Sequence, residues 1–140
     1  MTIEQAIKTA ARWWRDKISK KPHHDNGDMS FASMMAGIMA DSLAEDISDE
    51  KLDKFEEELI KILDLEVSQN CLPYTYLSCD YGPGLYLSDA ADIAGINYSC
   101  FPWKTNLQII RDMNDKTNYE VLVSDGYRAS WVSLEPVQEV

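Results

Sequence analysis

The stretch Ser30–Ala44, SFASMMAGIMADSLA, is the most apolar segment with helical spacing in this chain. Its large apolar residues recur every three or four positions, which places them on one face of an α-helix. They are Phe31, Met34, Met35, Ile38, Met39 and Leu43. The opposite side carries small residues instead of charges, namely Ala32, Ser33, Ala36, Gly37 and Ala40. Because such a helix can be packed from both sides, we expect it to lie at the centre of the fold.

The methionines of this stretch allow two interpretations. A Met-rich face can form an adaptable binding groove, but Met at helical spacing more often fills space in a core. Gly37 inside a helix costs about 1 kcal/mol relative to Ala. Its presence therefore suggests either a close crossing with a neighbouring backbone or a helix that is weak at this position.

Two further helices are expected on either side of this segment. The first runs from about Ile3 to Ile18, where Thr2 and Gln5 form a capping box. Trp13 lies off its apolar stripe, so it covers the edge of the core or faces a partner. The other runs from about Asp49 to Leu63 and is capped by Ser48. A short connection predicts that it forms an antiparallel hairpin with the central helix, which makes residues 1–66 a three-helix unit.

The pattern changes after residue 66. Strands are predicted over residues 74–80, 103–110, 119–123 and 129–134, because β-formers alternate there between turn signals. A short helix is expected over residues 85–94 with Gly95 just past its end. Asp125-Gly126 is a hairpin signal between the last two strands. We therefore predict a single α+β domain over residues 1–140, with a helical half and a small, mostly antiparallel sheet that carries one helix.

Composition narrows the class of protein. A chain of 140 residues with 45% apolar residues can bury a core. The sequence shows neither an apolar run long enough to span a bilayer nor a secretion signal at its start, so no membrane association is expected. Cys71, Cys79 and Cys100 are odd in number and fit no disulfide framework, which favours a reducing cytosol.

Charge is unevenly distributed along the chain. The net charge is −11, and residues 41–66 hold eleven Asp or Glu against three Lys. Such a chain repels nucleic acid as a whole and favours basic partners. On the predicted helix over residues 49–63, we expect a partner-binding face built from Asp49, Asp53, Glu56 and Glu57. These carboxylates would occupy the positions that nucleic-acid phosphates fill in a basic groove. A solvated helix face is the simpler interpretation.

An alternative ligand site is centred on the turn formed by residues 81–84. The turn lies between a predicted strand and the start of a helix, a place suited to anions. Trp103 and Lys104 could stack on a nucleotide and pair with its phosphate, although such a Trp more often packs on the core while the Lys is solvated. A plain turn is the favoured interpretation of the glycines. The candidate ligand-binding residues are Asp80, Tyr81, Gly82, Gly84, Trp103 and Lys104.

Catalytic and metal sites are not indicated by spacing. Both histidines fall in one loop, and neither lies near a Cys or Ser that could act as a nucleophile. His23, His24, Asp25 and Asp28 are metal ligands by residue type, but their spacing matches no zinc pattern. We therefore predict no cofactor and no metal, and lean against an enzyme. An enzyme whose catalytic residues are brought together only by the fold is our third hypothesis, after the two binding functions described below.

A resemblance covers residues 79–109, about a quarter of the chain. Asp80-Tyr81-Gly82-Pro83, Ala94-Gly95-Ile96 and Phe101-Pro102-Trp103-Lys104-Thr105 follow one another there. This pattern resembles small proteins carried by phages and mobile elements of gut Firmicutes. The resemblance implies a mobile-element origin and a bacterial host cytoplasm, and it brings no catalytic residue.

These observations lead to ranked hypotheses. The first is a non-enzymatic acidic binding protein that inhibits a host nucleic-acid-handling defence, in the manner of an anti-CRISPR protein. Its partner would be a basic, nucleic-acid-binding protein. The alternative is a protein that binds or sequesters a nucleotide through the turn described above. A homo-oligomer formed through the Trp13 edge or a sheet edge is also compatible with the sequence.

Overall fold

The computed structural model describes residues 1–20, 30–43, 46–69, 74–126 and 129–138. Its helices are α1 (Ile3–Ser19), α2 (Phe31–Leu43), α3 (Asp49–Leu63) and α4 (Leu85–Ala94), with a π-helical turn η1 (Asp64–Gln69) and a 3-10 turn η2 (Tyr98–Cys100). Its strands are β1 (Tyr74–Cys79), β2 (Thr105–Arg111), β3 (Tyr119–Asp125) and β4 (Val132–Ser133). Three α-helices precede an antiparallel sheet, and α4 lies between β1 and β2, so the α+β class is confirmed.

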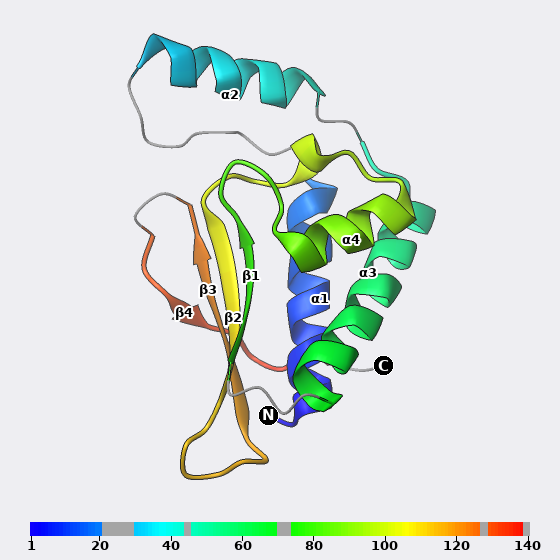
Figure 1. Cartoon of the computed structure of the whole chain (residues 1–140), viewed down its shortest axis with the longest axis vertical. Coiled ribbons are helices and arrows are strands. Elements are labelled where there is room, and N and C mark those ends of the chain that lie inside the picture. The colour runs from blue at the N-terminus through cyan, green and yellow to red at the C-terminus, as the bar shows by residue number, and fades with distance from the viewer. Residues whose placement is uncertain (21–29, 44–45, 70–73, 127–128, 139–140) are drawn as a thin grey trace.

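The sheet is an antiparallel meander in the order β1-β2-β3-β4. Alternate residues of the first three strands face the helices, and register aligns Leu77 with Leu107 and Leu107 with Val123. Figure 1 shows α1, α3 and α4 on one side of this sheet. The opposite face is more open, as the half-exposed ring of Tyr76 indicates.

The core lies between the sheet and the pair α1 and α3. Trp14 of α1, Phe55 of α3 and Phe101 are all fully buried, and the Phe101 ring centroid lies 6.1 Å from that of Trp14 and 5.8 Å from that of Phe55. Phe101 follows η2, so a residue from the second half of the chain joins the two helices. The buried cluster thus contains side chains from both halves.

Capping residues in the sequence predicted the ends of several helices correctly. Thr2 and Gln5 form the expected capping box, and the Ser48 side chain accepts from the Lys51 amide. Gly95 closes α4 in the left-handed region with φ 74°. Trp13 is partly buried at the edge of the core, where its ring meets Trp14 edge-on and Lys17 lies over it.

The position of α2 contradicts our expectation. This helix does not lie between α1 and α3, which pack directly on each other. Figure 1 shows it apart from the other helices at one end of the molecule, and it contacts η2. Gly37 is buried, whereas Phe31 is 78% and Ile38 59% exposed. The predicted central rod and its hairpin with α3 are therefore wrong, because hydrophobic spacing defines a face but not what covers it.

Smaller differences concern strand and helix ends. The π-helical turn η1 and the 3-10 turn η2 were not predicted. β2 begins at Thr105, two residues later than expected, and β4 is reduced to two residues. Lys104 breaks the strand before Thr105, because its φ of 58° is left-handed.

Candidate functional site

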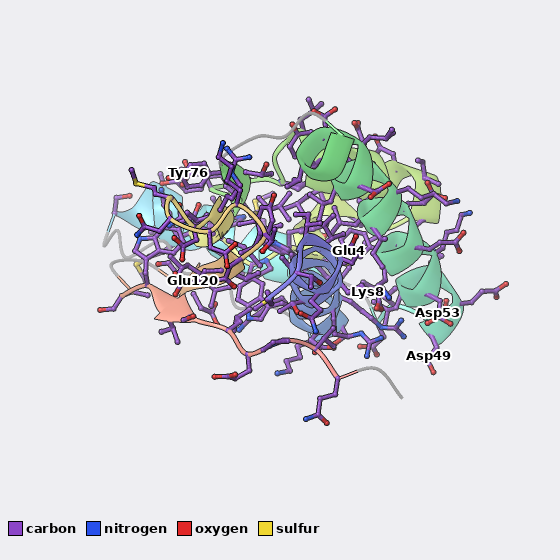
Figure 2. The ribbon with its side chains drawn as sticks, turned by 90° about the horizontal axis from the view of Figure 1, so that it is seen from below. Glu4, Lys8, Asp49, Asp53, Tyr76 and Glu120 are labelled. Atoms are coloured by element: carbon purple, nitrogen blue, oxygen red, sulfur yellow. The ribbon has the colours of Figure 1, made fainter. Side chains whose placement is uncertain are left out.

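The four carboxylates proposed as a partner-binding face all lie on α3, but they do not form one open surface. Figure 2 shows Asp49 and Asp53 at one end of α3, on the side of the molecule away from the sheet. The side chain of Asp53 is 69% exposed and that of Glu57 58% exposed. Glu56, in contrast, is only 12% exposed. The expected face therefore loses one of its four members.

Glu56 is turned toward α1 by two arginines. Arg12 Nε lies 2.8 Å and 3.1 Å from its two carboxylate oxygens, and Arg15 donates to Oε2 at 3.0 Å. Arg15 also donates to Asp53 at 2.5 Å. Burial of Arg15 disfavours its charged form, but the hydrogen bonds to Asp53 and Glu56 outweigh this effect and raise its pKa. The arginines thus neutralise charge that was assigned to a partner.

The outward carboxylates further along α3 are paired with lysines of the same helix. Lys61 lies 3.1 Å from Glu57 and 3.3 Å from Glu58, as helical spacing allows. Lys54 pairs with Glu58 at 3.1 Å, not with Glu50 as helix spacing alone would also permit. Hydrogen bonds from Lys54 and Lys61 lower the pKa of Glu58. This part of α3 is therefore close to neutral.

A less neutralised acidic region lies where α3 begins. Lys51 Nζ donates to the carbonyl of Gly95 at 3.1 Å, so the start of α3 meets the end of α4. We call the exposed carboxylates at this junction the acidic corner. Its members are Asp46, Asp49, Glu50 and Asp53 from α3 and its approach, and Asp89 and Asp92 from α4.

The acidic corner has an electrostatic effect on its neighbour Tyr98. The Tyr98 hydroxyl donates to Asp92 Oδ1 at 2.7 Å. This hydrogen bond raises the pKa of Tyr98, and the charge of Asp89 acts in the same direction. Of the six carboxylates, Asp53 is the one that forms an ion pair among the described residues, with Arg15. Lys51 adds one positive charge at this junction, so the acidic corner keeps a net negative charge that is smaller than its six carboxylates alone would give.

The turn residues proposed as a ligand site are brought together by the fold. The Lys104 amide donates to the carbonyl of Asp80 at 3.0 Å, and its ammonium forms an ion pair with the Asp80 carboxylate. That ammonium also lies 4.4 Å from the centroid of Tyr81, whose ring meets Trp103 edge-on at 5.2 Å. The sequence thus identified neighbours that are more than 20 residues apart.

The geometry of this cluster is that of a closed turn. Asp80 holds the Lys104 ammonium, and this hydrogen bond raises the pKa of Lys104. The Gly84 amide donates to Ser78 O at 2.8 Å, and a Cβ on Gly84 would come within 3.1 Å of that same oxygen. Gly82 has open space around it. A phosphate would have to displace Asp80 from Lys104, so the nucleotide interpretation stays a prediction without a free cation to support it.

Nucleophilic and metal chemistry gain no support from the described residues. Cys79 and Cys100 are buried free thiols. Burial, with the charge of Asp80, raises the pKa of Cys79 to about 12, so this thiol stays protonated near neutral pH. No group of three His, Cys, Asp or Glu residues is placed to hold a metal within the described ranges. The cluster of His23, His24, Asp25 and Asp28, and also Cys71, lie outside those ranges.

Sequence reasoning missed two parts of the charge distribution. It did not foresee that Arg12 and Arg15 would face α3, although both flank the apolar stripe of α1 at one-turn spacing. Nothing in the local pattern shows that α4, which carries Asp89 and Asp92, ends beside the start of α3.

Comparison with known proteins adds no family to this description. Neither a protein-family model nor a curated protein matches the chain. Among the described residues, no helix is both long and apolar enough to cross a bilayer. Function is therefore inferred from charge and geometry.

Proposed function

We propose that this chain is a non-enzymatic acidic binding protein whose partner is a basic protein surface of the kind that binds nucleic acid. The observation that carries this proposal is the acidic corner. Asp49 and Asp53 are exposed there, although Asp53 also pairs with Arg15. Glu56 and Glu58 are mostly shielded from solvent and are neutralised by cations of this same chain. Carboxylates held on rigid helices attract a basic partner and steer its approach.

The revised surface differs from the one expected from sequence. Asp49 and Asp53 are retained, whereas Glu56 and Glu57 are left out because cations of this chain pair with them. The added carboxylates are Asp46, Glu50, Asp89 and Asp92. The carboxylates come from two helices that meet at the contact between Lys51 and Gly95, so the negative charge is not confined to one helix. The net charge of −11 adds a long-range attraction that salt weakens.

Inhibition of a host defence is the biological role we attach to this surface. A protein that occupies a basic nucleic-acid-binding groove prevents nucleic acid from entering it. The mobile-element resemblance of residues 79–109 supports this context. The candidate targets are therefore the nucleic-acid-binding effectors of bacterial defence systems, including CRISPR effectors.

The experiment measures binding of the full chain to a panel of purified bacterial defence effectors. We expect at least one effector to bind, to be displaced by its own nucleic acid, and to lose at least about tenfold in affinity between low and physiological salt. Charge reversal by Asp49→Lys should weaken this binding. Asp112→Lys, at an exposed position in the β2–β3 connection, makes the same charge change as a control.

Three outcomes contradict the proposal. One is an effector complex whose affinity is insensitive to salt, because carboxylates would then contribute little. Another is equal weakening by Asp49→Lys and Asp112→Lys, which would assign the effect to net charge instead of the acidic corner. The last is a panel without any binder, which counts against a nucleic-acid-binding target.

A further inference from the structure

The outward face of α2 is the largest group of exposed apolar side chains on one element of the described chain. Its five large residues span two helical turns at three- and four-residue spacing, so they share one face. Their exposed fractions are Phe31 78%, Met34 54%, Met35 41%, Ile38 59% and Met39 62%. None of these five residues belongs to the buried core cluster.

Gly37 marks the inner side of α2. This glycine is buried, and α2 contacts η2. An ordinary surface helix buries its large apolar residues, whereas α2 leaves its large apolar residues exposed. A face of this kind is expected to be covered in the working form of the protein.

The area of this face matches what a small symmetric interface requires. From the exposed fractions, the five side chains leave on the order of 500 Å² open. Two such faces in contact would bury about 1,000 Å², the lower limit for a specific protein interface. A pair of this size is expected to be weak and to depend on protein concentration.

The charge distribution of the chain favours a second copy over other candidates as the partner of the α2 face. Asp41 is the one ionisable residue in the sequence of α2, whereas the whole chain carries −11. Two copies that met through the acidic corner would repel each other, but the five apolar residues of two α2 faces can meet without bringing the acidic corners together. An anionic membrane would repel the rest of the chain, and α2 shows none of the cations that interfacial helices use. Methionine side chains, which adapt to irregular contacts, suit a self-complementary surface.

We propose that the outward face of α2 pairs with the same face of a second copy, which forms a two-fold symmetric dimer. The same patch on both copies makes this contact closed, so assembly stops at two. This surface is separate from the acidic corner, and the dimer does not depend on the proposed function. In a dimer the chain would present two acidic corners to its partners.

The experiment is sedimentation velocity of the full chain from about 1 µM to about 1 mM, the range in which a weak interface of this area dissociates. We expect the sedimentation coefficient to rise from monomer to dimer over this range. Ile38→Glu and Met34→Glu should each weaken dimerisation at least about tenfold, because a buried unpaired carboxylate opposes association. Met113→Glu, at a 95% exposed position in the β2–β3 connection, is the matched control and should dimerise like the unmodified chain.

Salt gives the dimer a signature opposite to that of partner binding. Raising the salt concentration should strengthen dimerisation, because it screens repulsion between two acidic copies while the apolar contact persists. The same change should weaken binding at the acidic corner. Failure of one proposal is therefore distinguishable from failure of the other.

Three results would overturn the dimer. The first is a monomer at every concentration. The second is a dimer that survives both Ile38→Glu and Met34→Glu while circular dichroism shows that the variants are folded. The third is a monomer that co-sediments with uncharged phosphatidylcholine vesicles, which would make lipid the occupant of the α2 face.

Discussion

Arg12 and Glu56 join α1 to α3 through a two-pronged contact in which one Arg nitrogen lies 2.8 Å and 3.1 Å from the two carboxylate oxygens. Glu56 is mostly shielded from solvent, and Arg15 holds it from a second direction. A carboxylate that sequence patterning assigned to a partner therefore connects two helices of the chain itself.

Removal of this carboxylate should destabilise the fold. Glu56→Gln leaves Arg12 and Arg15 without their shared partner, and we expect a loss of about 1–2 kcal/mol in the free energy of unfolding. Glu57→Gln is the matched control, since its exposed pair with Lys61 should contribute less than about 0.5 kcal/mol. Urea denaturation measures both, and equal effects would show that the inter-helix contact is no stronger than the surface pair.

Core and surface positions of the helices should respond differently to truncation. Leu59 is fully buried on α3, so Leu59→Ala should cost about 2–5 kcal/mol. Ile38→Ala on α2 should change stability by less than about 0.5 kcal/mol when it is measured near 1 µM, where separate copies do not associate. A large loss at Ile38 would place α2 in the core after all, as its hydrophobic pattern first indicated.

Gly95 ends α4 in a conformation that a side chain disfavours. With φ at 74°, Gly95→Ala should cost about 1 kcal/mol. Gly82→Ala is the control, because an added Cβ there meets nothing within 4 Å and φ is not left-handed. Thermal unfolding of the two variants compares them directly. An unchanged midpoint for Gly95→Ala would mean that α4 ends without requiring a left-handed residue at this position.

The buried thiol of Cys79 predicts a loss of stability at alkaline pH. Its pKa is raised from an ordinary value of 9.0 to about 12 in the folded state, so the unfolded chain releases this proton first. Stability from this group is complete below pH 9 and falls as pH rises from 9 toward 12, with a slope of up to about 1.4 kcal/mol per pH unit.

The comparison with Cys79→Ala isolates this contribution. Tyr86 and Tyr98 also have raised pKa values and act in the same direction, so total stability falls in the variant too. Urea denaturation at about pH 8 and about pH 10.5 should show the smaller decrease in Cys79→Ala. In the folded chain near neutral pH, Cys79 should also resist alkylation. Parallel decreases in both proteins would mean that the thiol is more accessible than its burial indicates.

The nucleotide alternative leads to a direct ligand test. Because Asp80 holds the Lys104 ammonium, we expect nucleoside triphosphates and cyclic nucleotides to leave thermal stability unchanged. A ligand present at about 100 times its Kd would add about 2.7 kcal/mol, which a thermal-shift assay detects readily. Such a stabilisation, abolished by Lys104→Met and retained in Lys116→Met, would restore the turn cluster as a ligand site.

Prediction from sequence succeeded where the determining contacts are local. The capping box at Thr2, the cap at Ser48 and the glycine at position 95 act within a few residues of each helix end. Alternation likewise identified the buried side of β3, where Val121 and Val123 face the core. The turn cluster is predicted in part, because residue type alone groups Trp103 and Lys104 with Asp80. Their contacts are seen only in the tertiary structure.

By itself the sequence determined where the four α-helices and, to within two residues at their ends, the first three strands lie. It also determined which face of each is apolar and that the chain is strongly acidic. Only the tertiary structure decided what lies against each face: η2 against α2, two arginines against Glu56, and Asp80 against Lys104. The physical reason is that helix and strand periodicity arises from neighbours a few residues apart. Burial of a face and pairing of a charge depend on residues tens of positions away. No local pattern encodes which of these distant residues makes the contact.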